Sequence, residues 1–471
     1  MTFNRVTEED IQALEAVVGP ERISAGESNL HLHSMDQTHH KGYLPEAVLW
    51  PGSTEEVSAI LRLANERKIP VTPWGAGTSL EGNCCPVAGG IILDFQEMTR
   101  ILAFRAEDFQ VDVEAGVTYK DMNHTLARSG LFFPPDPGAN ATIGGMIANN
   151  ASGIRTIKYG ATRDNVLRLT AVLADGRVIH AGSRSAKSSS GYDLVRLITG
   201  SEGTLAVVTE ATLRLRGIPE AFSAAVATFD SVRRAAEAVY GIMAYGLTPS
   251  ALEILDERSI RYINKENETP LTEKATLLIE FTGNNEAGLA EDLDQVREVC
   301  EENGCHGFRQ GVGREERNRL WETRHRFGEC FIRSHPGLDV LIMDAAVPLS
   351  RFPDLVEKAV AVADEHGLEN CVSAHAGDGN LHLNVAGDMA DPVFFDHLTR
   401  AYDEIVDYAI SVGGTATGEH GIGIGKRKFM QLEHGNGVDV MRDIKRRLDP
   451  HGILNPGKVL PEALEGSGEV S

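Results

Sequence analysis

The sequence contains no C-x-x-C pair. Its cysteines are Cys84, Cys85, Cys300, Cys305, Cys330 and Cys371. Without closely spaced pairs there is no support for an iron–sulfur cluster, a zinc ribbon or a C-x-x-C-H haem site. Six cysteines in 471 residues are too few for a disulfide framework, which favours a reducing compartment.

Long apolar runs and excess positive charge are also missing. No uninterrupted apolar segment is long enough to span a bilayer. The N-terminal stretch MTFNRVTEEDIQALEAVVG predicts a capped amphipathic helix rather than a signal peptide. The net charge of −23 argues against nucleic acid or an anionic membrane as a partner. These features predict a cytoplasmic protein, with peripheral contact at the inner membrane left open.

The order of predicted elements indicates more than one domain. A helix over 53–68 lies between strands at 46–51 and 69–74, and further strands are predicted at 89–95 and 204–215. Asp175-Gly176 predicts a hairpin turn between two strands within 165–179. We expect these to form a first domain over 1–217. Helices at 231–246, 287–304, 349–367 and 394–412 alternate with strands at 274–283 and 339–348 over 218–440. This pattern predicts a second α+β domain with a mainly antiparallel sheet. A C-terminal segment, 441–471, is expected to pack back on the first domain, to be turn-rich over 445–461 and to have a frayed end.

Several glycine- and serine-rich loops follow predicted strands. WGAGTSLEG (74–82) is neither a G-x-G-x-x-G turn leading into a helix nor a P-loop. Small residues still expose successive backbone N–H groups, which can bind phosphate. Similar segments occur at 134–160, at 187–210 and at NPGK (455–458). A tight turn explains any one of them equally well, but together they favour a large polar cofactor.

Two histidines flank a glycine-rich turn in AHAGDGNLHLNV (374–385). His382 and Asn384 are two residues apart and therefore share one face of a strand, whereas His375 lies across the turn. TGEHGIG (417–423) offers Glu419 and His420 as further groups. Two histidines and one glutamate around an open coordination position are typical of a catalytic metal site. Zn is the first choice, with Mn or Fe as alternatives. A lone histidine is more often a satisfied polar group, and the His39-His40 pair is interpreted as surface or loop.

These segments, in this order and over nearly the whole chain, resemble the FAD-linked oxidases of the vanillyl-alcohol-oxidase/PCMH superfamily. HAGDGNLHLNV, GGTATGEHGIGIGKRKFM and LDPHGILNPGKVLP resemble the branch of D-lactate dehydrogenases, D-2-hydroxyglutarate dehydrogenases and glycolate oxidase flavin subunits. The resemblance implies an α+β chain with a PCMH-type FAD-binding domain and a cap domain that carries the metal site. It also implies an FAD-dependent D-2-hydroxy-acid dehydrogenase that does not use NAD.

The resemblance assigns residues. Metal ligands would be His375, His382 and Glu419, and the base would be His420. Arg324 would bind the substrate carboxylate, with Arg326 and Arg333 as alternatives. Without a functional role, these arginines would simply form a solvated basic face of a helix. Asn384 would join the catalytic group. FAD would contact Gly75, Ala76, Gly77, Thr78, Ser79, Pro135, Gly138, Thr142, Gly144, Gly145, Asn149, Ser152, Gly153, Tyr159, Gly160, Glu202, Gly203, Val208, Asn455 and Lys458. Some relatives link flavin through a histidine where Thr78 stands, so non-covalent FAD is expected.

The implied chemistry is oxidation of a 2-hydroxy acid to the 2-oxo acid. The metal would lower the pKa of the hydroxyl, His420 would take its proton, and flavin N5 would receive the hydride. The D-2-hydroxyglutarate branch has Thr where Gly328 stands and Lys where Ile342 stands. Burial of an unpaired second carboxylate would be costly. D-lactate is therefore favoured, with longer apolar D-2-hydroxy acids next and glycolate open.

The sequence is also compatible with other classes of protein. The chain could be a D-2-hydroxyglutarate dehydrogenase, a glycolate oxidase flavin subunit or a non-catalytic FAD subunit of an oxidase complex. A non-redox flavoenzyme of the ether-lipid synthase type and a metal-binding protein without flavin are further alternatives. Electrons would leave to a separate quinone, cytochrome, electron-transfer flavoprotein or iron–sulfur subunit. The sequence leaves the oligomeric state open, a homodimer included.

Overall fold

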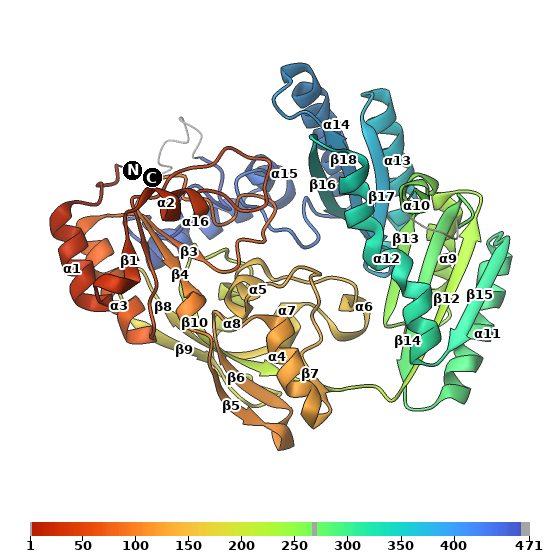
Figure 1. Ribbon diagram of the computed structural model, residues 1–471, viewed down its shortest axis with the longest axis horizontal. Coiled ribbons are helices and arrows are strands. Elements are labelled where there is room, and N and C mark those ends of the chain that lie inside the picture. The colour runs from red at the N-terminus through yellow and green to blue at the C-terminus, as the bar shows by residue number, and fades with distance from the viewer. Residues whose placement is uncertain (1, 266–270, 463–471) are drawn as a thin grey trace. The chain divides into compact units, whose positions relative to one another are not determined.

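The computed structural model describes residues 2–265 and 271–462, except for the side chains at positions 322, 323, 325 and 326. The chain divides into two compact units (Figure 1). The first comprises Met1–Ala151, Ala161–Gly217 and Glu419–Ser471, and the second comprises Ser152–Gly160 and Ile218–Gly418. The end predicted to be frayed lies almost wholly outside the described residues. In the described ranges, no helix combines the length and the apolar character needed to cross a membrane.

A small sheet with three parallel strands opens the first unit. Its order is β1 (Ile23–Ser24), β2 (Ala47–Leu49), β4 (Ile91–Asp94) and β3 (Val71–Trp74), with β1 antiparallel to β2. Helices α1 (Glu8–Val18) and α3 (Thr54–Arg67) begin at side-chain caps, Thr7 and Ser53, as their sequences predict. Their apolar residues share one core with the sheet. The predicted helix over 53–68 is thus confirmed.

The second sheet of the first unit is antiparallel. Its order is β5 (Ile101–Arg105), β6 (Gln110–Glu114), β10 (Val207–Arg214), β8 (Val166–Val172) and β9 (Val178–Gly182). The predicted turn between β8 and β9 contains Gly176 at φ 82°, a left-handed conformation that glycine adopts without strain. The shorter elements of this unit are α2 (Glu27–Leu32), α4 (Tyr119–Leu126), β7 (Leu131–Phe132), α5 (Ile143–Asn149), α7 (Thr162–Asn165), α8 (Leu194–Ile198) and β11 (Arg216–Gly217).

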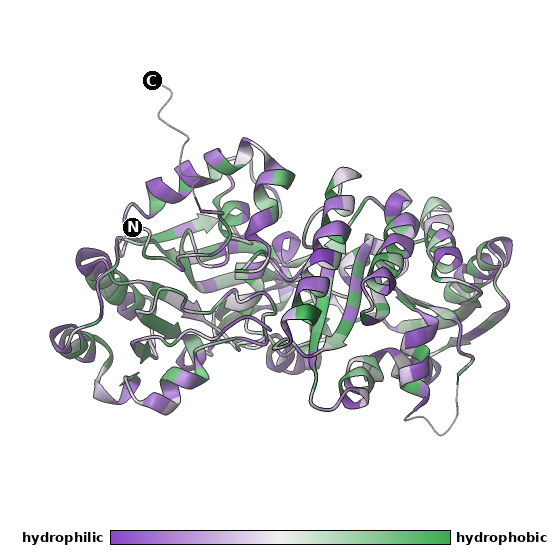
Figure 2. Cartoon of the chain, turned by 90° about the horizontal axis from the view of Figure 1, so that it is seen from above, coloured by the Kyte–Doolittle hydropathy of each residue, from purple (hydrophilic) through white to green (hydrophobic). Residues whose placement is uncertain are grey.

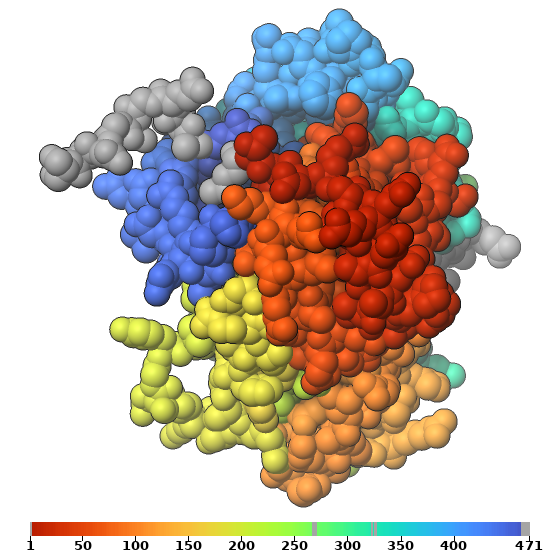
Figure 3. All heavy atoms as spheres, turned by 90° about the vertical axis from the view of Figure 1, so that its left-hand side faces the viewer, coloured from red at the N-terminus to blue at the C-terminus, as the bar shows by residue number. Residues whose placement is uncertain are grey.

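The C-terminal part of the chain returns to the first unit. It contains α15 (Met430–His434) and α16 (Gly437–Leu448), and Leu454 then forms a parallel bridge with Val71 of β3. Figure 3 shows these dark-blue residues beside the red N-terminal ones. The segment expected to be turn-rich from 445 is still helical up to Leu448. That expectation was wrong for its first four residues, because the basic run at 445–447 forms the last turn of an amphipathic helix.

One seven-stranded antiparallel sheet organises the second unit. Its order is β15 (Gly307–Val312), β12 (Ala221–Phe229), β14 (Ala275–Gly283), β13 (Ala251–Leu255), β17 (Glu369–His375), β18 (Asn380–Gly387) and β16 (Asp339–Ala346). The predicted α+β class with a mainly antiparallel sheet is confirmed. Strands β12, β13 and β15 were not predicted from the sequence.

The two faces of this sheet differ. Apolar side chains of one face form a core with α9 (Val232–Ala244), α11 (Glu286–Glu302), α13 (Phe352–Glu365) and α14 (Pro392–Ser411). Helices α10 (Glu257–Asn264) and α12 (Arg314–Ser334) pack on the other face, and α6 (Thr156–Tyr159) completes the unit. In Figure 2 these helices carry both purple and green residues, as expected for elements with one buried side. Leu381, Leu383 and Val385 lie in the apolar core, on the face of β18 opposite to His382 and Asn384.

Candidate active site

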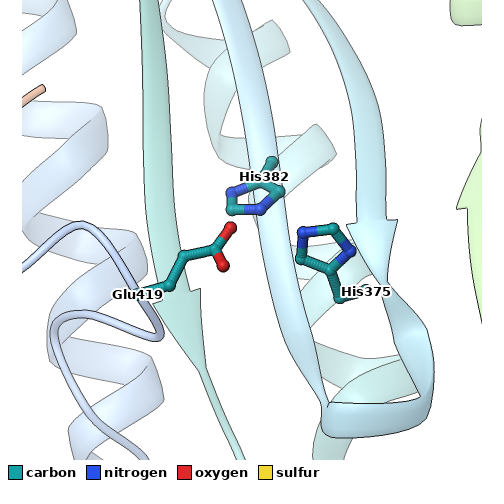
Figure 4. A group of neighbouring side chains, drawn as sticks. All are labelled: His375, His382 and Glu419. Carbon is teal, nitrogen blue, oxygen red and sulfur yellow. The ribbon is translucent and has the colours of Figure 1, made fainter. Parts of the chain in front are cut away.

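A hairpin in the second unit brings two histidines together. His375 ends β17 and His382 lies in β18, and the tight turn between them includes Gly379 at φ 69°. The two imidazole ring centroids are 5.0 Å apart and the rings are nearly perpendicular, at 89°. One ligand atom from each of His375, His382 and Glu419 lies within 4.8 Å of the other two (Figure 4). In the described part of the chain this is the only such group of three metal-ligating side chains.

Asp344 fixes the segment that leads to Glu419. It lies in β16 directly opposite His382 and is fully buried. Its Oδ1 accepts hydrogen bonds from the Gly418 backbone N–H at 3.0 Å and from Asn380 Nδ2 at 2.6 Å. Its Oδ2 accepts one from the Thr417 hydroxyl at 2.7 Å. Glu419 follows Gly418 directly, so its position is set from this side by a buried carboxylate that the sequence analysis did not identify.

Glu253 is a second buried carboxylate that the sequence analysis missed. It lies in β13, opposite His375 of β17. Its Oε1 is 2.7 Å from His375 Nδ1, and its Oε2 is 2.8 Å from Arg324 Nε. A single acidic residue in the apolar strand ALEIL was the available signal, since an ionised side chain is seldom buried without partners.

The remaining predicted residues near the hairpin differ in their surroundings. Asn384 shares the face of His382 and donates to the Ser373 hydroxyl at 3.1 Å. Arg324 is largely buried on α12, with 15% of its side chain exposed. Arg333 is 58% exposed and pairs with Glu329 on its own helix, which suits a solvated helix face. The side chain of the other alternative, Arg326, lies outside the described residues.

In the first unit, buried polar groups hold the main chain around His420. Glu202 Oε1 accepts from the Ile422 N–H at 2.6 Å, and its Oε2 accepts from the Gly423 N–H at 2.9 Å. Asn83 donates to the Glu202 carboxylate at 2.8 Å and to the His420 carbonyl at 3.3 Å. Burial raises the pKa of Glu202, and the hydrogen bonds from Ile422, Asn83 and Gly423 oppose that rise. Glu202 is one of the residues predicted from the sequence to contact FAD, whereas Asn83 is not among the predicted site residues.

The glycine-rich segments of the first unit meet one another. A Cβ added to Gly75 would lie 2.3 Å from the Thr142 hydroxyl, so the first two segments touch. The Asn455 amide donates to the carbonyls of Asn83 and Glu202, at 2.8 and 2.7 Å. Lys458 is buried nearby, and burial lowers its pKa to about 8. The absence of a side chain at Gly75, where other segments approach closely, fits a loop whose backbone N–H groups bind a diphosphate.

The other predicted flavin residues are divided between the units. Ala76, Gly77, Thr78, Ser79, Pro135, Gly138, Gly144, Gly145, Asn149, Gly203 and Val208 belong to the first unit, whereas Ser152, Gly153, Tyr159 and Gly160 belong to the second. The Asn149 amide donates to the His420 carbonyl at 3.4 Å. Its predicted cofactor role is therefore accompanied by a contact with the same loop that Glu202 holds.

The His39-His40 pair lies in a loop, as expected, but is half-buried rather than on the surface. The ring centroids are 4.1 Å apart. The His40 Nε2 is 4.0 Å from the Glu81 carboxylate. Burial, followed by the charge of His39, lowers the pKa of His40 to about 4.

Comparison with known protein families finds two matches along the chain. Residues 45–182 match the FAD binding domain, and residues 218–459 match the C-terminal domain of FAD linked oxidases. The chain belongs to the FAD-linked oxidases. It is therefore a flavin-dependent oxidoreductase, and the resemblance noted in its sequence is confirmed.

Two curated relatives and one solved structure add detail. The chain is 39% identical to the D-lactate dehydrogenase [cytochrome], mitochondrial, of Arabidopsis thaliana, over 98% of this chain and 81% of the relative. It is 36% identical to the glycolate oxidase subunit GlcD of Bacillus subtilis, over 96% of this chain and 97% of the relative. The structure of p-cresol methylhydroxylase with substrate bound matches with a TM-score of 0.78 at 17% sequence identity. The match covers 96% of this chain and 97% of that structure. The last similarity shows the PCMH-type fold.

Proposed function

We propose that this flavoenzyme oxidises a D-2-hydroxy acid, with D-lactate favoured, to the corresponding 2-oxo acid. The observation that carries the proposal is the convergence of His375, His382 and Glu419, with the largely buried Arg324 joined to His375 through Glu253. Two imidazoles and a carboxylate suit a divalent metal, with Zn preferred and Mn or Fe as alternatives. The names of the Arabidopsis and Bacillus relatives support a hydroxy-acid substrate.

Each group has a distinct task in this proposal. When bound, FAD supplies the hydride acceptor and the metal supplies a Lewis acid for the substrate hydroxyl. His420 takes the hydroxyl proton, because an imidazole titrates near the working pH. Arg324 binds the carboxylate through its Nη groups, since Glu253 occupies its Nε. Asn384 lines the same face of the sheet as His382.

The cofactor assignments follow the fold family. We assign FAD to the glycine-rich segments of the first unit and to the 152–160 segment, held without a covalent bond because Thr78 stands at the linkage position. The functional parts of the chain in this proposal are an FAD-binding domain over 1–217, a cap domain over 218–440 and a C-terminal segment over 441–471. The close approach of Gly75 to Thr142, and the hydrogen bonds from Asn455 to the carbonyls of Asn83 and Glu202, support this assignment for the first unit.

Two positions near Arg324 and Asn384 favour a substrate with a single carboxylate. Gly328 lies one helical turn after Arg324, and Ile342 lies opposite Asn384 in the sheet register. Neither can pair with a second carboxylate, so D-2-hydroxyglutarate would gain no partner for that group at these two positions. D-lactate is accordingly preferred to D-2-hydroxyglutarate, while a glycolate oxidase flavin subunit is the nearest alternative. A non-catalytic FAD subunit is the alternative of a different class.

The electron acceptor is proposed to be a separate carrier. The name of the Arabidopsis relative contains cytochrome and the Bacillus relative is named as a subunit, which supports a partner of that kind. A quinone, an electron-transfer flavoprotein or an iron–sulfur subunit would serve as well. Cytoplasmic placement and a homodimer remain predictions.

Anaerobic reduction of the purified flavoprotein tests the function. D-lactate, L-lactate, glycolate and D-2-hydroxyglutarate are mixed with it separately, with and without prior chelation, and bleaching of the flavin band is followed. Fast bleaching by D-lactate that chelation abolishes is expected. Preference for D-2-hydroxyglutarate would contradict the argument from Gly328 and Ile342. No bleaching by any of the four would favour another substrate or a non-catalytic subunit.

A further inference from the structure

Glu253 lies between two groups with different proposed tasks. It is fully buried and hydrogen-bonds both His375, a proposed metal ligand, and Arg324, the proposed carboxylate clamp. We propose that Glu253 is a positioning residue that sets the tautomer of His375 and the orientation of Arg324 together. The inference rests on the proposed function, because it takes those two assignments as given.

The contact with His375 decides which ring nitrogen can bind a metal. An ionised carboxylate only accepts hydrogen bonds, so His375 Nδ1 must donate its proton to Glu253 Oε1, 2.7 Å away. In a neutral imidazole the other nitrogen, Nε2, then carries the lone pair. Figure 4 shows one ring nitrogen of His375 facing His382 and Glu419 and the other facing away. A carboxylate behind a histidine is a common device for orienting a metal ligand.

The contact with Arg324 directs its guanidinium. Glu253 Oε2 accepts from Nε at 2.8 Å. No described residue accepts a hydrogen bond from the two Nη groups, which would be left for a substrate carboxylate. The fork geometry of arginine favours a paired hydrogen bond to such a group. One buried residue therefore links the group that would hold the metal to the group that would hold the substrate.

Glutamine at position 253 cannot satisfy both contacts. Arginine is always a donor, so the amide oxygen would turn to Arg324. The amide N–H would then face His375 Nδ1, which must become an acceptor and leave the proton on Nε2. That tautomer has no lone pair for a metal at Nε2. Glu253→Gln therefore favours the wrong tautomer of His375 even though the side chain keeps its size.

A matched control lies on the neighbouring strand. Glu280 of β14 is also buried, accepts from Arg317 of α12 and accepts from the Ser250 hydroxyl at 2.8 Å. It has the same kind of glutamate–arginine contact between the sheet and the same helix, but its second partner is Ser250 instead of His375. A serine hydroxyl can also accept a hydrogen bond, so glutamine is compatible with Ser250. Glu280→Gln thus tests the general effect of neutralising a buried glutamate.

The test measures Zn²⁺ binding to the FAD-loaded protein after chelation, by calorimetric titration, with KM for D-lactate as a second readout. We expect Glu253→Gln to weaken Zn²⁺ binding about 10- to 100-fold, the range for loss of a carboxylate behind a metal ligand, and to raise KM. Glu280→Gln should leave both close to wild type. If Glu253→Gln does not fold, Glu253→Asp, which keeps the charge but shortens the reach, should show a smaller loss of the same kind.

Three results would overturn the inference. Wild-type affinity in the Glu253 variant would overturn it while leaving the proposed metal site intact. Equal losses in the Glu253 and Glu280 variants would reduce Glu253 to a structural residue. Failure of the wild-type protein to bind Zn²⁺ would reject the metal part of the proposed function, and the inference with it.

Discussion

Replacing Glu202 by Gln is expected to slow flavin reduction by D-lactate without releasing FAD. The Glu202 carboxylate accepts from two backbone N–H groups, those of Ile422 and Gly423, and from the Asn83 amide. Glutamine offers one acceptor oxygen instead of two. At least the Ile422 N–H or the Gly423 N–H would then face an amide N–H group.

The size of the expected loss in the rate of flavin reduction follows from that lost acceptor. A buried N–H without an acceptor costs about 1–3 kcal/mol. If the whole cost falls on the ordered conformation of the loop that carries His420, the reactive population falls by up to about 5- to 150-fold. Removing the buried charge offsets part of this cost, because burial already raises the pKa of Glu202. The expected loss therefore lies towards the lower end of the range.

The assay is stopped-flow bleaching of the flavin at saturating D-lactate, with FAD content measured in parallel. Glu114→Gln is the control, because Glu114 is as deeply buried in the first unit but bonds Arg100 instead of the 419–423 loop. A Glu202 variant that reduces its flavin as fast as wild type would refute the reasoning. Loss of FAD with an unchanged loop would instead support the flavin contact expected from the sequence.

Three further outcomes are expected. His382→Ala should lower bound Zn²⁺, measured by elemental analysis, to less than about one tenth of wild type while FAD stays bound, because a catalytic site with three protein ligands loses one. Gly328→Thr with Ile342→Lys should raise kcat/KM for D-2-hydroxyglutarate relative to D-lactate by about tenfold or more, since the lysine can pair the second carboxylate; an added Cβ at Gly328 meets nothing within 4 Å. His40→Gln should flatten the pH dependence of urea unfolding between about pH 4 and 6.5, where the wild type should lose up to about 3 kcal/mol.

The sign of the His40 effect follows from its depressed pKa of about 4 in the folded state. The unfolded state binds more protons between that value and the ordinary pKa of histidine, so stability is present above the ordinary pKa and falls as the pH falls. An unchanged pH dependence in His40→Gln would contradict this. Full Zn²⁺ content in His382→Ala would contradict the ligand assignment. Unchanged substrate preference in the double variant would contradict the substrate argument.

The sequence by itself determined the elements whose signals are local. The Ser53 cap and the apolar spacing after it specify α3, and Asp175-Gly176 specifies the turn between β8 and β9. The alternation in LHLNV separates a core face from a polar face, because successive side chains of a strand point to opposite sides. The family, its FAD and the candidate hairpin could also be read from motifs, since their residues are adjacent in the chain.

Tertiary structure alone decided which distant groups meet. Glu253 reaches His375 only because β13 pairs with β17, and neither β13 nor that pairing was predicted. Asp344 reaches the residues before Glu419 across 74 positions, and Glu202 reaches Ile422 across 220. A hydrogen bond between residues so far apart leaves no periodic pattern in the chain. The contacts of these supporting carboxylates therefore emerged only from the tertiary structure, while the side chains they position were already visible as motifs.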